Sequence, residues 1–199
     1  MQRSAKGFCR YITMKNAISF DPFSDRLARD IRNGLSTAFA RAVYTLNSSR
    51  LEESVATWEQ SEIPQPMAAY INDRIRRYRS VLDQIHSENE IDPRRQSLAA
   101  WNEQLYFEVH EILEAIWQPA TGDRRKALQG LILAAGVGEH RQYGHTTAAE
   151  RLSGKADQLI RRYRRPHLEF IDNLEDLLDW LQNWNASPPG LRPAEDLKI

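Results

Sequence analysis

The stretch that decides the fold is residues 101–143, which read WNEQLYFEVHEILEAIWQPATGDRRKALQGLILAAGVGEHRQY. In its first half the apolar side chains recur three or four positions apart, which is the spacing of one face of an α-helix. The second half is apolar almost all round, which is typical of a helix at the centre of a bundle. Between them, Pro119 to Asp123 form a short predicted loop. The stretch therefore predicts an antiparallel helical hairpin.

The same helical periodicity extends over the rest of the chain, and no segment alternates apolar and polar residues as a half-buried strand would. Asp-Pro pairs at Asp21 and Asp92 are typical of a helix cap followed by proline in the first turn. We expect helices from these pairs to about Leu46 and to Trp117, and a last helix that Pro166 opens. The predicted fold class is all-α, a single-domain bundle of about six to seven helices around the central hairpin.

The expected domain organisation follows from length and composition. The chain has 199 residues, of which 41% are hydrophobic, and this is enough for one core of ordinary size. We expect a single helical domain over residues 21–186, a loose N-terminal extension over 1–20 and a loose C-terminal tail over 187–199. Met14, which Lys follows, is an alternative start to Met1.

Charge and cysteine content narrow the possible partners. Lys+Arg and Asp+Glu both number 27, so the formal net charge is zero, and neither nucleic acid nor a membrane is an expected partner. The arginine-rich runs 74–79 and 161–165 are interpreted as solvated helix faces. No apolar run reaches the roughly 18 residues of a membrane span. The single cysteine, Cys9, favours a cytoplasmic setting, and the sequence requires no cofactor.

A polar patch on the first helix of the hairpin is the best candidate for chemistry. His110 and Glu114 lie four residues apart and therefore on one face of the helix, in a gap between aromatic side chains. Glu108 and Glu111 fall on the strip of the helix that we expect to face water. A carboxylate and an imidazole in contact can act as a base, as metal ligands or as a structural hydrogen bond.

The register of the hairpin extends this patch to the second helix. Because the loop is short, Arg125 and Gln129 are expected opposite the His–Glu pair. His140 lies further along the axis and is expected at the end of the partner helix near Asn102, too far from His110 to share a metal. The predicted polar cluster comprises Glu108, His110, Glu111, Glu114, Arg125, Gln129 and His140.

Over residues 101–156 the chain resembles the uncharacterised family called domain of unknown function 309. The resemblance rests on Trp101-Asn102, the run Tyr106 to Glu114, Trp117, Arg125, Leu128 to Ile132 and His140. The chain departs from the family at two positions: Gln104 stands where the family often has glycine, and Trp101 stands where the family has phenylalanine. The resemblance implies a small all-helical bundle but no activity, because the role of the family is not established.

The first functional interpretation is a non-enzymatic helical module that binds a protein partner or a small ligand, or forms a homodimer. The contact surfaces would be the tryptophan-rich ends with Trp117, Trp180 and Trp184, and the pocket beside the His–Glu pair. In this interpretation the predicted cluster is a buried His-Glu-Arg-Gln network that fixes the register of the hairpin.

The alternative is a metal-dependent, hydrolase-like enzyme. His110-Glu111-x-x-Glu114 is similar to the His-Glu-x-x-His helix of zinc proteases, with Glu111 in the place of the general base. Because Glu114 replaces the second histidine and the sequence offers no third ligand, no metal site is predicted. The two interpretations differ in geometry, since a site requires that solvent reaches His110 or Glu114, whereas a structural network requires that both are buried and paired.

Overall fold

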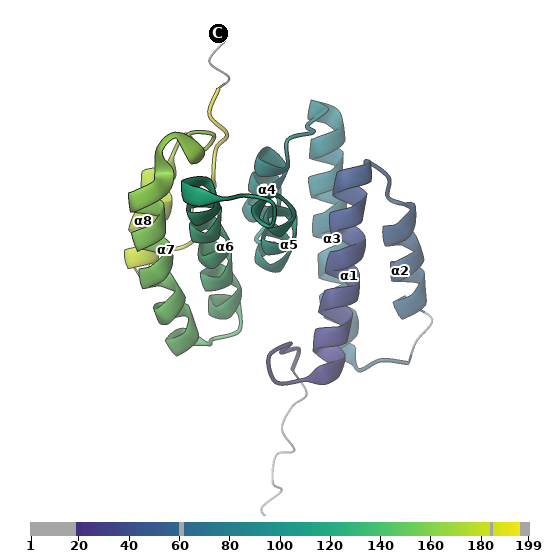
Figure 1. The fold of residues 1–199 in the computed structure, drawn as a ribbon. Helices are drawn as coiled ribbons and strands as arrows, with labels where there is room; N and C mark the ends of the chain where they lie inside the picture. Colours follow the sequence, from purple (N-terminus) through teal and green to yellow (C-terminus); the bar gives the residue numbers. More distant parts are fainter. Residues whose placement is uncertain (1–18, 60–61, 184, 196–199) are drawn as a thin grey trace, which may run out of the picture.

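The computed structural model describes residues 19–59, 62–183 and 185–195, and within these ranges the chain is all-α, without strands (Figure 1). The helices are α1 (Arg26–Thr45), α2 (Ser49–Glu59), α3 (Gln65–Glu88), α4 (Pro93–Asn102), α5 (Tyr106–Trp117), α6 (Gly122–Gln142), α7 (Thr146–His167) and α8 (Leu174–Gln182). The predicted fold class is confirmed. Met14, Cys9 and Trp184 lie outside the described residues.

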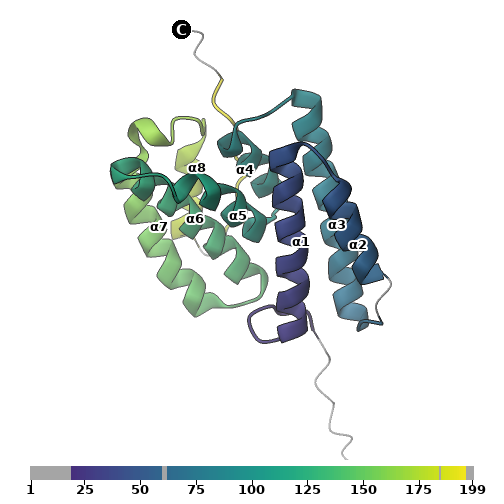
Figure 2. The ribbon, with the colours of Figure 1, turned by 45° about the vertical axis from the view of Figure 1, so that its right-hand side comes forward.

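The helices form two groups that α4 and α5 join (Figures 1 and 2). The first group contains α1, α2 and α3, and the second contains α6, α7 and α8. Helix α6 packs most extensively against α7 and also against α5, while α5 contacts α1 on its other side. The predicted hairpin of α5 and α6 is therefore present, and α5 is the helix that connects the two halves of the bundle.

The predicted first helix of the hairpin is shorter than expected, because the helix that begins at Pro93 does not continue to Trp117. Helix α4 ends at Asn102, and Gln104 has φ +57°, a left-handed conformation that favours glycine. The amide of Leu105 donates to the carbonyl oxygen of Ala100 at 3.0 Å, which closes the helix end. This break raises the number of helices above the six to seven expected, and the glutamine gave no signal for it.

Two helices also begin later than predicted. Asp21 closes a turn instead of capping a helix, and α1 is capped by Asp25, whose carboxylate accepts from the amide of Ala28 at 2.7 Å. Pro166 does not open the last helix, because it lies near the end of α7, and α8 begins only at Leu174. Both differences move a helix start but leave the order of the helices unchanged.

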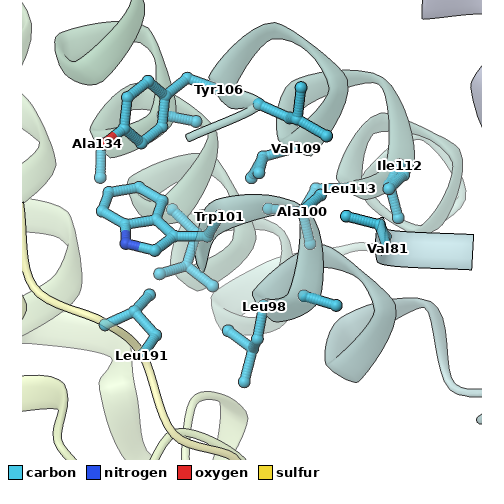
Figure 3. Close-up of a cluster of buried hydrophobic side chains, with 14 of the residues drawn as sticks. Val81, Leu98, Ala100, Trp101, Tyr106, Val109, Ile112, Leu113, Ala134 and Leu191 are labelled. Carbon is cyan, nitrogen blue, oxygen red and sulfur yellow. The ribbon is translucent and has the colours of Figure 1, made fainter. Parts of the chain in front are cut away.

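The C-terminal segment was expected to be loose from Ser187 onwards, and its described part is instead held against α4. The indole Nε1 of Trp101 donates to the carbonyl oxygen of Pro189 at 2.8 Å. The side-chain amide of Asn102 donates from Nδ2 to the carbonyl oxygen of Leu191 at 2.9 Å, and its Oδ1 accepts from the backbone N–H of Leu191 at 2.7 Å. Leu191 is buried beside Trp101 (Figure 3). The tryptophan at this position thus makes a hydrogen bond that phenylalanine cannot make.

Two glycines of α6 allow close approach of neighbouring helices. A Cβ atom at Gly138 would lie 2.6 Å from the ring of Tyr106 on α5, and one at Gly130 would lie 2.8 Å from Ile160 on α7. Ala134, between them, lies beside the ring of Tyr106 (Figure 3). The small residues of α6 therefore serve two different helix contacts.

Substitution by alanine should have opposite effects at Gly138, which lies against Tyr106, and at Gly154, which has open space around it. Gly138→Ala should lower the free energy of unfolding by about 1–3 kcal/mol, because the methyl group overlaps the ring of Tyr106. Gly154→Ala, on the open side of α7, should raise it by roughly 0.5–1 kcal/mol through helix propensity. Urea denaturation of both variants measures the difference, and equal stability of the two would contradict the packing described.

Candidate functional site

The structure separates the predicted polar cluster into several groups. His110, Glu111 and Glu114 stay together on α5, and we call them the α5 triad. Glu108 points to α3, Arg125 turns back to the end of α5, and His140 packs on the turn before α1. Each group therefore has a different neighbour.

The α5 triad brings three potential metal ligands together on one helix. One ligand atom from each side chain lies within 4.8 Å of the other two. His110 Nδ1 is 3.4 Å from Glu111 Oε1, and Gln118 Nε2 donates to Glu114 Oε1 at 3.3 Å. The side chains of His110 and Glu111 are 38% and 28% exposed, and Glu114 is half-buried. The triad is therefore open to solvent, which the buried-network interpretation does not allow.

The electrostatic field at the α5 triad favours a cation. The hydrogen bond with Glu111 raises the pKa of His110 more than burial lowers it, and the negative charges of Glu111, Glu114 and Glu139 act in the same direction. Next to the triad, partial burial and the charge of Glu111 raise the pKa of Tyr44 to about 12. The protonated phenol of Tyr44 donates to the carbonyl oxygen of Ile112 at 2.7 Å and so ties α1 to α5.

Glu108 was expected to face water, and this expectation is wrong. Its side chain is 0% exposed and accepts a hydrogen bond from the hydroxyl of Tyr78 at 2.5 Å. Glu108 Oε2 lies 4.0 Å from the Arg74 guanidinium, and Arg74 is itself buried although it belongs to a run interpreted as solvated. Burial lowers the pKa of Arg74, but Glu108 and the neighbouring tyrosines Tyr70, Tyr78 and Tyr143 together outweigh burial, and the pKa is raised. Helix α3 covers the strip of α5 that was expected to face water, because a projection of α5 alone does not show its neighbours.

Arg125 and Gln129 do not join the His–Glu pair, so the predicted network is wrong. Arg125 NH1 donates to three carbonyl oxygens at the end of α5, including that of Gln118 at 2.9 Å. Its guanidinium lies 3.9 Å from the centre of the Trp117 ring. Gln129 is half-buried and makes no side-chain hydrogen bond within the described ranges. The arginine thus stabilises the loop between α5 and α6 instead of neutralising Glu114.

His140 lies at the expected level of the bundle, because Gln142, two positions further on, donates to the carbonyl oxygen of Gln104 at 2.9 Å, but the ring of His140 does not pack on Asn102. Its ring stacks on Phe23, with ring centres 4.4 Å apart, and lies 5.9 Å from the ring of His145. Burial lowers the pKa of His140, and the positive charges of His145 and Arg32 lower it further. The expected neighbour Asn102 instead binds the C-terminal segment. The turn before α1 carries no sequence signal for this long-range contact.

An ion pair between α1 and α6 was missed by the sequence analysis. Arg32 NH1 lies 2.6 Å from Glu139 Oε1, and both side chains are largely buried. The same guanidinium lies 3.9 Å from the centre of the Phe107 ring on α5. Burial raises the pKa of Glu139, and Arg32 offsets part of this rise. The pair spans 107 positions of sequence, so no local pattern indicates it. It joins α1 to α6 across the start of α5, beside the triad.

The fold and the triad together define an all-helical protein whose central helix carries a half-exposed His-Glu-Glu set. Residues 95–152 match the family described as Domain of unknown function (DUF309), so this part of the chain is a DUF309 domain. The match begins in α4 and ends in α7, which confirms the resemblance seen in the sequence. No curated protein and no solved structure gives a significant match. None of the described helices combines the length and apolarity that crossing a membrane requires.

The burial of Glu108 with Arg74 predicts a strong energetic coupling between them. Arg74→Met and Glu108→Leu should each lower the free energy of unfolding by about 3–5 kcal/mol, because each leaves the other charge buried and unpaired. The double variant should lose much less than the sum. Arg76→Met, which removes an exposed ion pair from the same helix, should cost only about 0–1 kcal/mol. Denaturant unfolding of the four variants measures the coupling, and additive losses would contradict it.

Proposed function

We propose that the protein is a helical module that binds a divalent transition-metal ion at the α5 triad. The proposal is carried by the convergence of three ligand atoms within 4.8 Å on a half-exposed helix face. Ligand atoms that each lie about 2.1 Å from one ion in tetrahedral geometry are about 3.4 Å apart, so the three ligand atoms need to close by at most about 1.4 Å. The exposed side chains have the freedom to do so.

The chemistry of the triad supports the same proposal. Two carboxylates and one neutral imidazole balance the charge of a divalent ion, and this ligand set suits zinc, iron or manganese. No lysine or arginine among the described residues forms an ion pair with Glu111 or Glu114. Their negative charge is therefore available to a cation. This role keeps the small-ligand form of the binding module and replaces its buried network with an open site.

The enzyme alternative has weaker support. Three protein ligands leave coordination positions for water, as in catalytic zinc sites. In the enzyme interpretation Glu111 is the general base, but Glu111 is also one of the three ligands of the proposed metal site. A carboxylate that binds the metal is not free to take a proton from the water. The geometry thus favours metal binding over metal-assisted hydrolysis.

The protein-partner form of the module also has less support than the metal-binding form. Trp180, expected on a contact surface, is only 3% exposed and packs against Trp101. Trp117 is half-buried, and Arg125 lies over its ring. These tryptophans do not offer the exposed aromatic anchors that protein interfaces use. Binding of a metal ion at the α5 triad is therefore the form of the binding module that has the most support.

Zinc titration of the protein and three variants tests the proposal. We expect the unmodified protein to bind one zinc ion in isothermal titration calorimetry. His110→Ala and Glu114→Gln should each weaken binding at least about tenfold, the scale on which even an outer-shell partner contributes. His86→Ala removes an exposed histidine far from the triad in sequence and should change nothing. Unchanged binding in the two triad variants would refute the site.

The raised pKa of His110 predicts a pH dependence of zinc affinity. Zinc binds the neutral imidazole, so it must displace the proton that the neighbouring carboxylates stabilise on His110. As the pH is lowered, the affinity for zinc should therefore begin to fall at a higher pH than at a site whose histidine has the ordinary pKa. Below that pKa the dissociation constant should rise about tenfold per pH unit. Competition titrations between about pH 8 and pH 6 measure this slope, and a flat profile would show that His110 is not a ligand.

A further inference from the structure

A pocket lies where the start of α4, the end of α5, the start of α6 and the end of α7 meet. Its volume is about 460 Å³, within the range of small-molecule sites. The lining residues are Asp92, Pro93, Arg94, Ile116, Arg124, Leu128, Pro166 and His167. None of them belongs to the α5 triad, so this pocket is a separate feature and does not depend on the proposed metal site.

The polar lining of this pocket carries a positive charge that the protein does not neutralise. Asp92 accepts from Arg94 Nε and NH2, at 2.9 and 2.6 Å, so this arginine is fixed in place and its charge is balanced. Arg124 forms no ion pair or hydrogen bond with its side chain inside the described ranges. The imidazole of His167 adds a further possible donor. The free guanidinium of Arg124 thus points to an anionic partner.

The remaining lining is apolar and distinguishes the pocket from a simple phosphate site. Leu128 is buried and Ile116 half-buried, and the rings of Pro93 and Pro166 complete the apolar part of the lining. Covering this apolar surface with an apolar group lowers the free energy of the complex. We infer that this pocket binds a small organic anion, with the phosphate or carboxylate group at Arg124 and His167 and a compact apolar body over Ile116 and Leu128. A guanidinium recognises either anion with two parallel hydrogen bonds.

Phenyl phosphate is a suitable probe because it joins a phosphate to a flat apolar ring. We expect it to bind saturably in a ¹H–¹⁵N NMR titration of the full chain, with shifts centred on residues 92–94, 124–128 and 166–167. Inorganic phosphate and benzyl alcohol each carry one half of the chemistry. Each should bind at least about tenfold more weakly than phenyl phosphate, since each loses one set of contacts.

Two charge-reversed variants separate the pocket from general electrostatic attraction. Arg124→Glu should weaken phenyl phosphate binding by about tenfold or more, because it places a negative charge in the lining. Lys126→Glu makes the same change two residues away at an exposed position outside the lining, and it should leave binding within about twofold. Equal losses in both variants, inorganic phosphate binding as tightly as phenyl phosphate, or shifts outside the pocket would each overturn the inference. Zinc binding at the α5 triad is measured in a separate titration, so its outcome does not affect this inference.

Discussion

The buried contact of Glu108 with Tyr78 and Arg74 is the constraint on which the arrangement of α5 depends. A carboxylate without solvent exposure must keep its partners, so α5 cannot rotate about its axis without leaving a charge unpaired. Successive side chains turn by about 100° on a helix, so His110 and Glu114 point roughly 200° and 240° away from Glu108. Fixing one side of α5 on α3 therefore directs the triad away from α3, toward Tyr44 of α1 and Glu139 of α6.

The second constraint is the close approach that α6 allows. Tyr106 fits against Gly138 only because no Cβ atom stands there, and this contact fixes the distance of α5 from α6. On the opposite side, the hydrogen bond of Tyr44 holds α1 on α5, and the pair Arg32–Glu139 holds α1 on α6. The position of the triad thus depends on contacts with three helices, while the triad itself uses only positions of one helix.

What could be predicted from the sequence was local. Helical periodicity gave the fold class and the hairpin, and the four-residue spacing placed His110 beside Glu114. Two of the failures, at Glu108 and at His140, involve a partner distant in sequence. Glu108 was assigned to water because a helical wheel does not show the covering helix α3, and the contact of His140 with Phe23 was missed because Phe23 comes from a distant turn. The break at Gln104 was missed for another reason, since a left-handed residue is signalled by glycine and glutamine stands there.

One short motif therefore encodes two physical roles. Within the run from Phe107 to Glu114, Glu108 faces inward and fixes the helix, while His110, Glu111 and Glu114 face solvent. The DUF309 match begins only at residue 95, yet the partners of Glu108 come from α3. Helices α1 and α3 thus supply the buried charge and the ion pair that the matched segment lacks on its own. The orientation of the triad therefore depends on contacts with residues that lie before the matched segment.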